Sequence, residues 1–65
     1  MIGGDEEKRA KFLRIYADVP DSLREDIIVV IDGKTYTWNT SYLEIKENTE
    51  LGKKILKTLE EIGII

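Results

Sequence analysis

The sequence contains no cysteine and no histidine. Without cysteine the chain forms no disulfide and offers no thiolate to a metal ion. Without histidine it lacks the commonest transition-metal ligand and the commonest general base near neutral pH. Only a Ser–Lys or Thr-based nucleophile could be built, and the serines and threonines are better explained as helix caps and strand residues. We therefore expect no enzyme activity, no cofactor and no metal.

Phosphate-binding glycine loops and long apolar runs are also missing. Neither G-x-x-x-x-G-K-[ST] nor G-x-G-x-x-G occurs. No apolar run approaches the length of a membrane span. The first residues show neither a signal-peptide core nor the glycine at position 2 that myristoylation requires. These absences predict a cytoplasmic protein that does not associate with membranes.

The chain has 65 residues, which is room for a single small domain, 1–65, and we expect residues 1–4 to be disordered. Hydrophobic residues make up 42% and charged residues 35%, with a net charge of −3, which is a folded composition. Abundant Ile, Lys and Glu without Gln are typical of proteins from hot environments. Lacking disulfides and metals, so short a chain depends on tight packing or self-association.

The N-terminal part predicts an amphipathic helix over residues 5–17, with Asp5 as its N-cap. Pro20 disfavours helical geometry in the residue before it and so ends this helix. Residues 20–25 predict one further helical turn, with Leu23 facing the core.

The middle of the chain predicts a β-hairpin. Residues 27–31 are all Ile or Val, which is the strongest strand signal in the sequence. Asp32 and Gly33 follow, and residues 34–38 then alternate in polarity. An Asp-Gly pair between two such runs predicts a type I′ turn, which requires positive φ at both positions.

A two-residue loop also fixes the pairing of the two strands. Ile31 is expected opposite Lys34, and Ile27 opposite Trp38, and directly paired residues share a face. The inward face is expected to carry Ile27, Val29, Ile31, Tyr36 and Trp38. The opposite face is expected to carry Ile28, Val30, Thr35 and Thr37.

Two patterns compete over residues 39–49. Ser41 and Glu44 match a capping box, which favours a short helix. Leu43 and Ile45 alternate with polar or aromatic neighbours, which favours a third strand, and a third strand would stabilise the hairpin. We expect the strand, with the helix as the alternative.

The C-terminal part predicts a second amphipathic helix over residues 49–62, capped by Asn48 or Thr49. Gly63 is placed as the left-handed residue of a Schellman motif. The expected fold is α+β: a small antiparallel β-hairpin or three-stranded sheet packed against N- and C-terminal amphipathic helices, in the order α-β-β-(β/α)-α.

The function suggested by this pattern is a non-enzymatic interaction module. Residues 27–31 are apolar on both faces, as in a strand covered on both sides, yet in a hairpin they form an edge strand. A second copy of the chain is the simplest cover, a different protein partner is another, and the chain's own helices or Ile64 and Ile65 are the alternative. The predicted partner interface consists of Ile28, Val30, Thr35 and Thr37.

A nucleic-acid interface is the first rival interpretation. Tyr36 and Trp38 alternate on a strand, as base-stacking aromatics do on some RNA-binding sheets. The first helix could add basic side chains from Lys8, Arg9, Lys11 and Arg14. The acidic net charge and the aliphatic neighbours of both aromatics make this nucleic-acid function the less favoured prediction.

A carboxylate site for a hard cation, or an acid–base pair, is the second rival interpretation. Its residues would be the acidic cluster around Pro20, namely Asp18, Asp21, Glu25 and Asp26. The spacing does not match an EF-hand loop, and helix capping or solvated loop charge explains these residues more simply.

Overall fold

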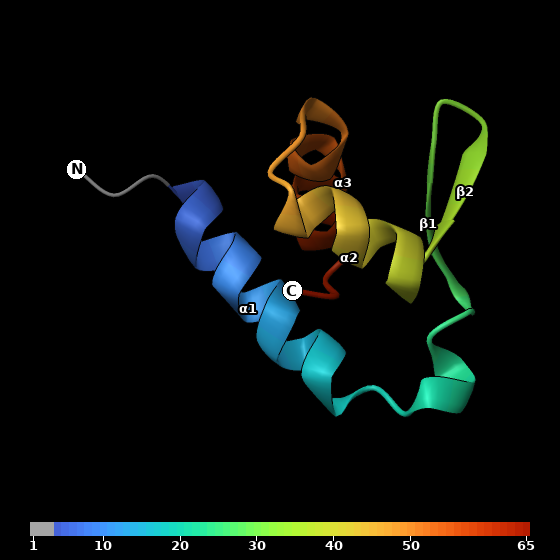
Figure 1. Ribbon diagram of the computed structural model, residues 1–65. Coiled ribbons are helices and arrows are strands. Elements are labelled where there is room, and N and C mark those ends of the chain that lie inside the picture. The colour runs from blue at the N-terminus through green and yellow to red at the C-terminus, as the bar shows by residue number, and fades with distance from the viewer. Residues whose placement is uncertain (1–3) are drawn as a thin grey trace.

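The computed structural model describes residues 4–65, whose elements follow in the order helix, strand, strand, helix, helix (Figure 1). The elements are α1 (Gly4–Asp18), a single turn of 3-10 helix η1 (Asp21–Leu23), β1 (Ile27–Ile31), β2 (Lys34–Thr37), α2 (Trp38–Lys46) and α3 (Glu50–Glu61). This is the α+β fold expected from the sequence. Gly4 is already helical, and residues 1–3 lie outside the described part of the chain.

The first helix and the turn after it lie where the sequence predicts them, while the Asp5 side chain, the expected cap, lies outside the described side chains. The inward position expected for Leu23 is wrong, because 47% of its surface is exposed. Local backbone bonds hold η1 in place, from Leu23 N–H to the Pro20 carbonyl at 2.9 Å and from Arg24 N–H to the Asp21 carbonyl at 3.2 Å. The turn therefore forms without burying a side chain.

The hairpin forms with the predicted turn and most of the predicted register. Asp32 and Gly33 have φ of 53° and 79°, which is the type I′ geometry. Ile31 lies opposite Lys34, as expected, but Ile27 lies opposite Thr37 and not Trp38, because the register shifts between Ile27 and Val29. The shift displaces Ile27 from the inward face, so its expected burial there is wrong.

The third strand expected over residues 39–49 is wrong, and the alternative helix is present as α2. It begins earlier than the Ser41 capping box would place it. Thr40 N–H donates to Thr37 Oγ1 at 3.1 Å, and Thr37 N–H donates to Thr40 Oγ1 at 2.7 Å. These paired bonds satisfy donors at the start of the helix, so the chain leaves the strand at Thr37 and Trp38 is already helical.

A close crossing joins α2 to α3. Thr49 caps α3, because its Oγ1 accepts from Gly52 N–H at 2.9 Å and donates to Glu44 Oε1 at 2.6 Å. Gly52 is buried, and a Cβ built on it would lie 2.7 Å from the carbonyl carbon of Glu44. Glycine at this position therefore lets the backbones of the two helices approach.

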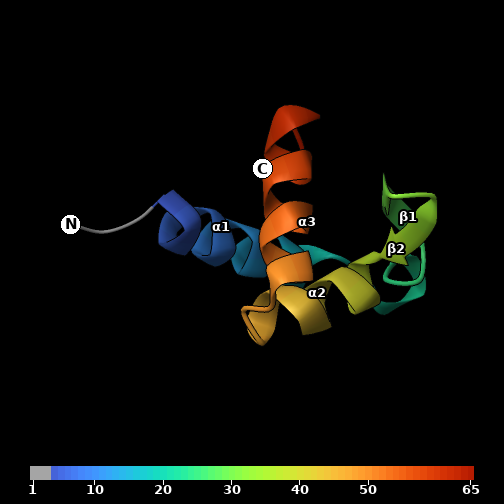
Figure 2. The same cartoon turned by 90° about the horizontal axis from the view of Figure 1, so that it is seen from above.

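The end of α3 forms the predicted Schellman motif. Gly63 has a φ of 86°, its N–H donates to the Glu60 carbonyl at 3.1 Å, and Ile64 N–H donates to the Leu59 carbonyl at 2.9 Å. The core lies between the helices and the inward face of the hairpin (Figure 2). Its buried side chains are Phe12, Val29, Ile45, Ile55, Leu56 and Leu59.

Candidate interaction surface on the hairpin

Strand β1 is buried on only one of its two faces. Val29 is 5% exposed and packs in the core, whereas Val30 is 57% exposed and Ile27 is 59% exposed. The chain's own helices, which were one of the alternative covers, therefore leave Val30 and Ile27 exposed. Ile64 and Ile65, one proposed cover, pack against the core and leave Val30 open.

The outward edge of β1 is open as well. The sheet has two strands, so each strand has an unpaired edge. Ile31 and Lys34 flank the two-residue turn and form a hydrogen-bonded pair, so the next pair, Val30 and Thr35, is a non-hydrogen-bonded one. The N–H and C=O groups of Val30 then point away from β2. Among residues 4–65, no backbone bond outside the ladder reaches Val30.

The four residues predicted for the interface divide into two groups. Val30 and Thr35 are exposed on the outer face of the hairpin. Ile28 is partly buried against the core, and Thr37 is partly buried and engaged in the cap of α2. Ile27 belongs to the exposed surface, and the sequence placed it on the wrong face because no local signal marks the register shift.

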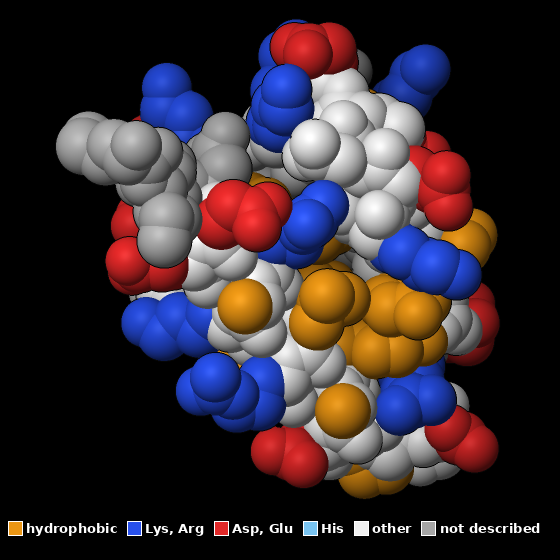
Figure 3. Space-filling view, turned by 60° about the vertical axis from the view of Figure 1, so that its left-hand side comes forward, with side chains coloured by type: hydrophobic (Ala, Val, Ile, Leu, Met, Phe, Trp, Pro, Cys, Tyr) orange, Lys and Arg blue, Asp and Glu red, His pale blue; other side chains and the backbone are white. Residues whose placement is uncertain are grey.

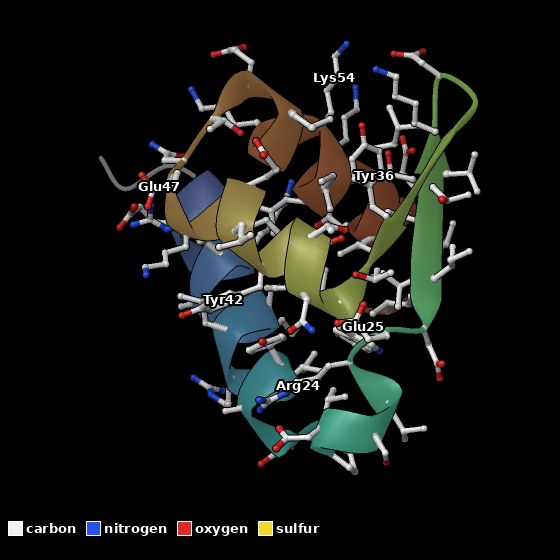
Figure 4. All side chains as sticks on the ribbon, turned by 45° about the vertical axis from the view of Figure 1, so that its right-hand side comes forward. Arg24, Glu25, Tyr36, Tyr42, Glu47 and Lys54 are labelled. Atoms are coloured by element: carbon white, nitrogen blue, oxygen red, sulfur yellow. The ribbon has the colours of Figure 1, made fainter. Side chains whose placement is uncertain are left out.

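Charge is distributed unevenly along this strand. Glu25 and Asp26 precede β1 and are exposed. At the other end, the turn carries Asp32, Lys34 follows it at the start of β2, and Lys54 Nζ lies 3.9 Å from Asp32 Oδ2. Figure 4 shows Glu25 near the base of the hairpin and Lys54 near its tip. The strand therefore runs from an acidic end to an end with two lysines and one aspartate.

The aromatic residues of the nucleic-acid interpretation are engaged within the fold. Tyr36 and Trp38 are partly buried and pack against the core, and the Trp38 ring centroid lies 5.8 Å from that of Phe12. On α1, Lys8 pairs with Glu60 at 2.8 Å. Arg9 pairs with Glu6 at 3.1 Å, while Lys11 and Arg14 are exposed. The structure does not bring these basic side chains together with an open aromatic face.

An aromatic stack between α1 and α2 was not predicted. The Tyr16 and Tyr42 rings are parallel, with centroids 4.3 Å apart and planes 8° apart. Arg24 lies 4.4 Å over Tyr16, and Lys46 Nζ lies 5.8 Å from the Tyr42 centroid. Tyr16 O–H also donates to Asn39 Oδ1 at 2.6 Å. The two rings are therefore held in a contact within the fold, with a cation near each of them.

On the side of the molecule shown in Figure 3, apolar side chains gather between basic ones. The strand expected over residues 39–49 places Tyr42 on the side opposite Leu43 and Ile45, and that strand does not form. The spacing of Tyr42 from Trp38 and Ile45 is the helical signal that could have placed it inward.

The acidic cluster around Pro20 does not converge. Its four carboxylates are exposed, Asp21 pairs with Arg24 at 2.9 Å, and Glu25 accepts from the Asn39 amide. Among the residues that the structure describes, no three acidic side chains are grouped so as to hold a metal ion.

A hollow of about 370 Å³ along α3 is lined by lysines and glutamates in similar number, so it favours neither an anionic nor a cationic ligand.

None of the helices in the described part of the chain is long and apolar enough to cross a membrane. Comparison of the chain with protein-family models, with curated proteins and with solved structures found no match.

Proposed function

We propose that the protein is a non-enzymatic interaction module that binds a second copy of itself through the outer edge and outer face of β1. The observation that carries the proposal is Val30, whose side chain is 57% exposed and whose backbone groups point to an open edge. Ile27, similarly exposed on the same strand, extends the apolar surface. Composition further predicts that this module works in the cytoplasm.

Two physical terms favour pairing at this strand. An apolar edge strand with unpaired N–H and C=O groups is a ready template for another strand. Addition of a strand satisfies those backbone groups and removes apolar surface from water, at roughly 25 cal/mol for each Å² buried. A second copy brings the same unpaired edge, so a two-fold pair satisfies both chains at once.

The contact is small, and we expect weak association. Stable interfaces bury about 800 Å² on each partner, and one short strand with its outer side chains supplies less than that. The dissociation constant should lie between roughly 10 µM and 1 mM. The protein would then pair only where its local concentration is high.

Analytical ultracentrifugation of the full chain over this concentration range tests the proposal. We expect a monomer–dimer equilibrium in the wild type and its loss in Val30→Lys, which places a charge at the shared edge. Leu43→Lys is the matched control, because Leu43 is 56% exposed but lies on α2. A wild type that sediments as a monomer up to about 1 mM would refute self-association at this strand.

A further inference from the structure

The geometry points to an antiparallel arrangement of the two copies, in which the acidic end of each β1 strand lies beside the hairpin tip of the other. This inference rests on the proposed self-association and adds the orientation of the partner. It follows from where the charges stand at the two ends of the strand.

The beginning of β1 is a negative end. Glu25 and Asp26 are adjacent in the chain and both are exposed. The nearest cation in the sequence is Arg24, whose guanidinium is engaged by Asp21 at 2.9 Å and lies over the Tyr16 ring. It therefore does little to offset these two carboxylates.

The tip of the hairpin is a positive end. Asp32 Oδ2 lies 3.9 Å from Lys54 Nζ, so this carboxylate already has a cation beside it. Lys34, exposed on β2 directly after the turn, adds a second positive charge. Figure 4 shows that Lys54 and Glu25 lie toward opposite ends of the hairpin.

In the two-fold antiparallel arrangement, the negative end of one copy faces the positive end of the other at two places. Antiparallel pairing sets the start of one strand against the end of the other, so Asp26 of each copy lies near the tip of its neighbour. Asp32 of the second copy is the facing aspartate, but Lys54 and Lys34 of that copy outweigh its charge. Parallel pairing would instead set the Glu25–Asp26 end of one copy against the same end of the other, which is repulsive.

Exchange of charge between the two ends tests this orientation. Asp26→Lys and Lys34→Glu each place like charges at both junctions of their own homodimer. We expect each variant to self-associate about fivefold more weakly than its matched control. An equimolar mixture should recover wild-type association, because each junction then joins opposite charges. Raising the salt concentration should reduce these differences.

Matched controls remove the effect of net charge. Glu47→Lys changes the net charge by the same amount as Asp26→Lys. Lys11→Glu changes it by the same amount as Lys34→Glu. Glu47 and Lys11 are both exposed and lie outside the hairpin. Figure 4 shows Glu47 on the opposite side of the molecule from β1. If the controls weaken association as much as the hairpin variants, net charge explains the effect and the orientation is wrong.

The remaining outcomes separate the two proposals. If Asp26→Lys pairs with wild-type protein more tightly than wild type pairs with itself, the strands run parallel and the inference is overturned. If wild type dimerises but the mixture shows no recovery, the acidic end of one β1 does not face the hairpin tip of the other, so the orientation fails while self-association stands. If neither wild type nor any mixture associates, the proposed function fails and the orientation fails with it.

Discussion

The crossing of α2 over α3 makes a quantitative prediction about Gly52. A Cβ at this position would lie 2.7 Å from the carbonyl carbon of Glu44 and 3.1 Å from the Cα of Ile45. Both atoms belong to the backbone of α2, so they cannot rotate away as the end of a flexible side chain would. Gly52→Ala therefore forces the two helices apart.

The change in the free energy of unfolding is the difference between the gain in helix propensity and the cost of overpacking. Alanine is favoured over glycine within a helix by about 1 kcal/mol. Overpacking of a tight contact costs about 1–3 kcal/mol, and the backbone contact here places this substitution at the upper end of that range. We expect Gly52→Ala to lower the free energy of unfolding by about 1–2 kcal/mol and the melting temperature by roughly 5–15 °C.

Thermal and urea unfolding followed by circular dichroism measure this change directly. Lys53→Ala is the matched control, because it lies next to Gly52 in the same helical turn but is exposed and keeps the contact intact. We expect the control to change stability by less than about 0.5 kcal/mol. A Gly52→Ala protein as stable as wild type, or more stable, would refute the close approach of the two helices.

Two further substitutions test where α2 begins. Thr37→Ala removes the side-chain oxygen that accepts from Thr40 N–H, and we expect it to lower stability to urea by about 1 kcal/mol, with Thr37→Ser close to wild type. Ser41→Ala should leave stability unchanged or raise it by up to about 1 kcal/mol, because Ser41 Oγ is buried and has no hydrogen-bond partner in the described structure. If Ser41→Ala were the destabilising change and Thr37→Ala the silent one, the helix would begin where the sequence pattern suggested.

The elements that could be predicted are those whose information is local. The Asp32-Gly33 turn can be predicted because two consecutive residues tolerate positive φ and stand between an apolar strand and one of alternating polarity. The role of Gly63 can be predicted for a similar reason. It follows an amphipathic run, and only glycine adopts the positive φ of this position freely. In both places one or two positions restrict the backbone strongly enough to override their surroundings.

The segment after β2 could not be assigned because its local signals conflict. Leu43 and Ile45 fit a strand by their spacing, while Ser41 and Glu44 fit a capping box that is not the one used. The actual cap begins at Thr37, a residue whose β-branched side chain also suits a strand. Burial of Ile45 against α3 favours the helix, and that contact depends on tertiary packing absent from the local pattern.

The position of that helix also bears on the candidate interface. With residues 38–46 helical, all three helices lie to one side of the hairpin, as Figures 1 and 2 show. No described part of the chain covers the other side, so Val30 and Ile27 stay exposed although their sequence is as apolar as that of a buried strand. The apolar pattern of β1 is thus satisfied on one face by its own chain, while Val30 and Ile27 form the exposed surface that the proposed self-association would cover.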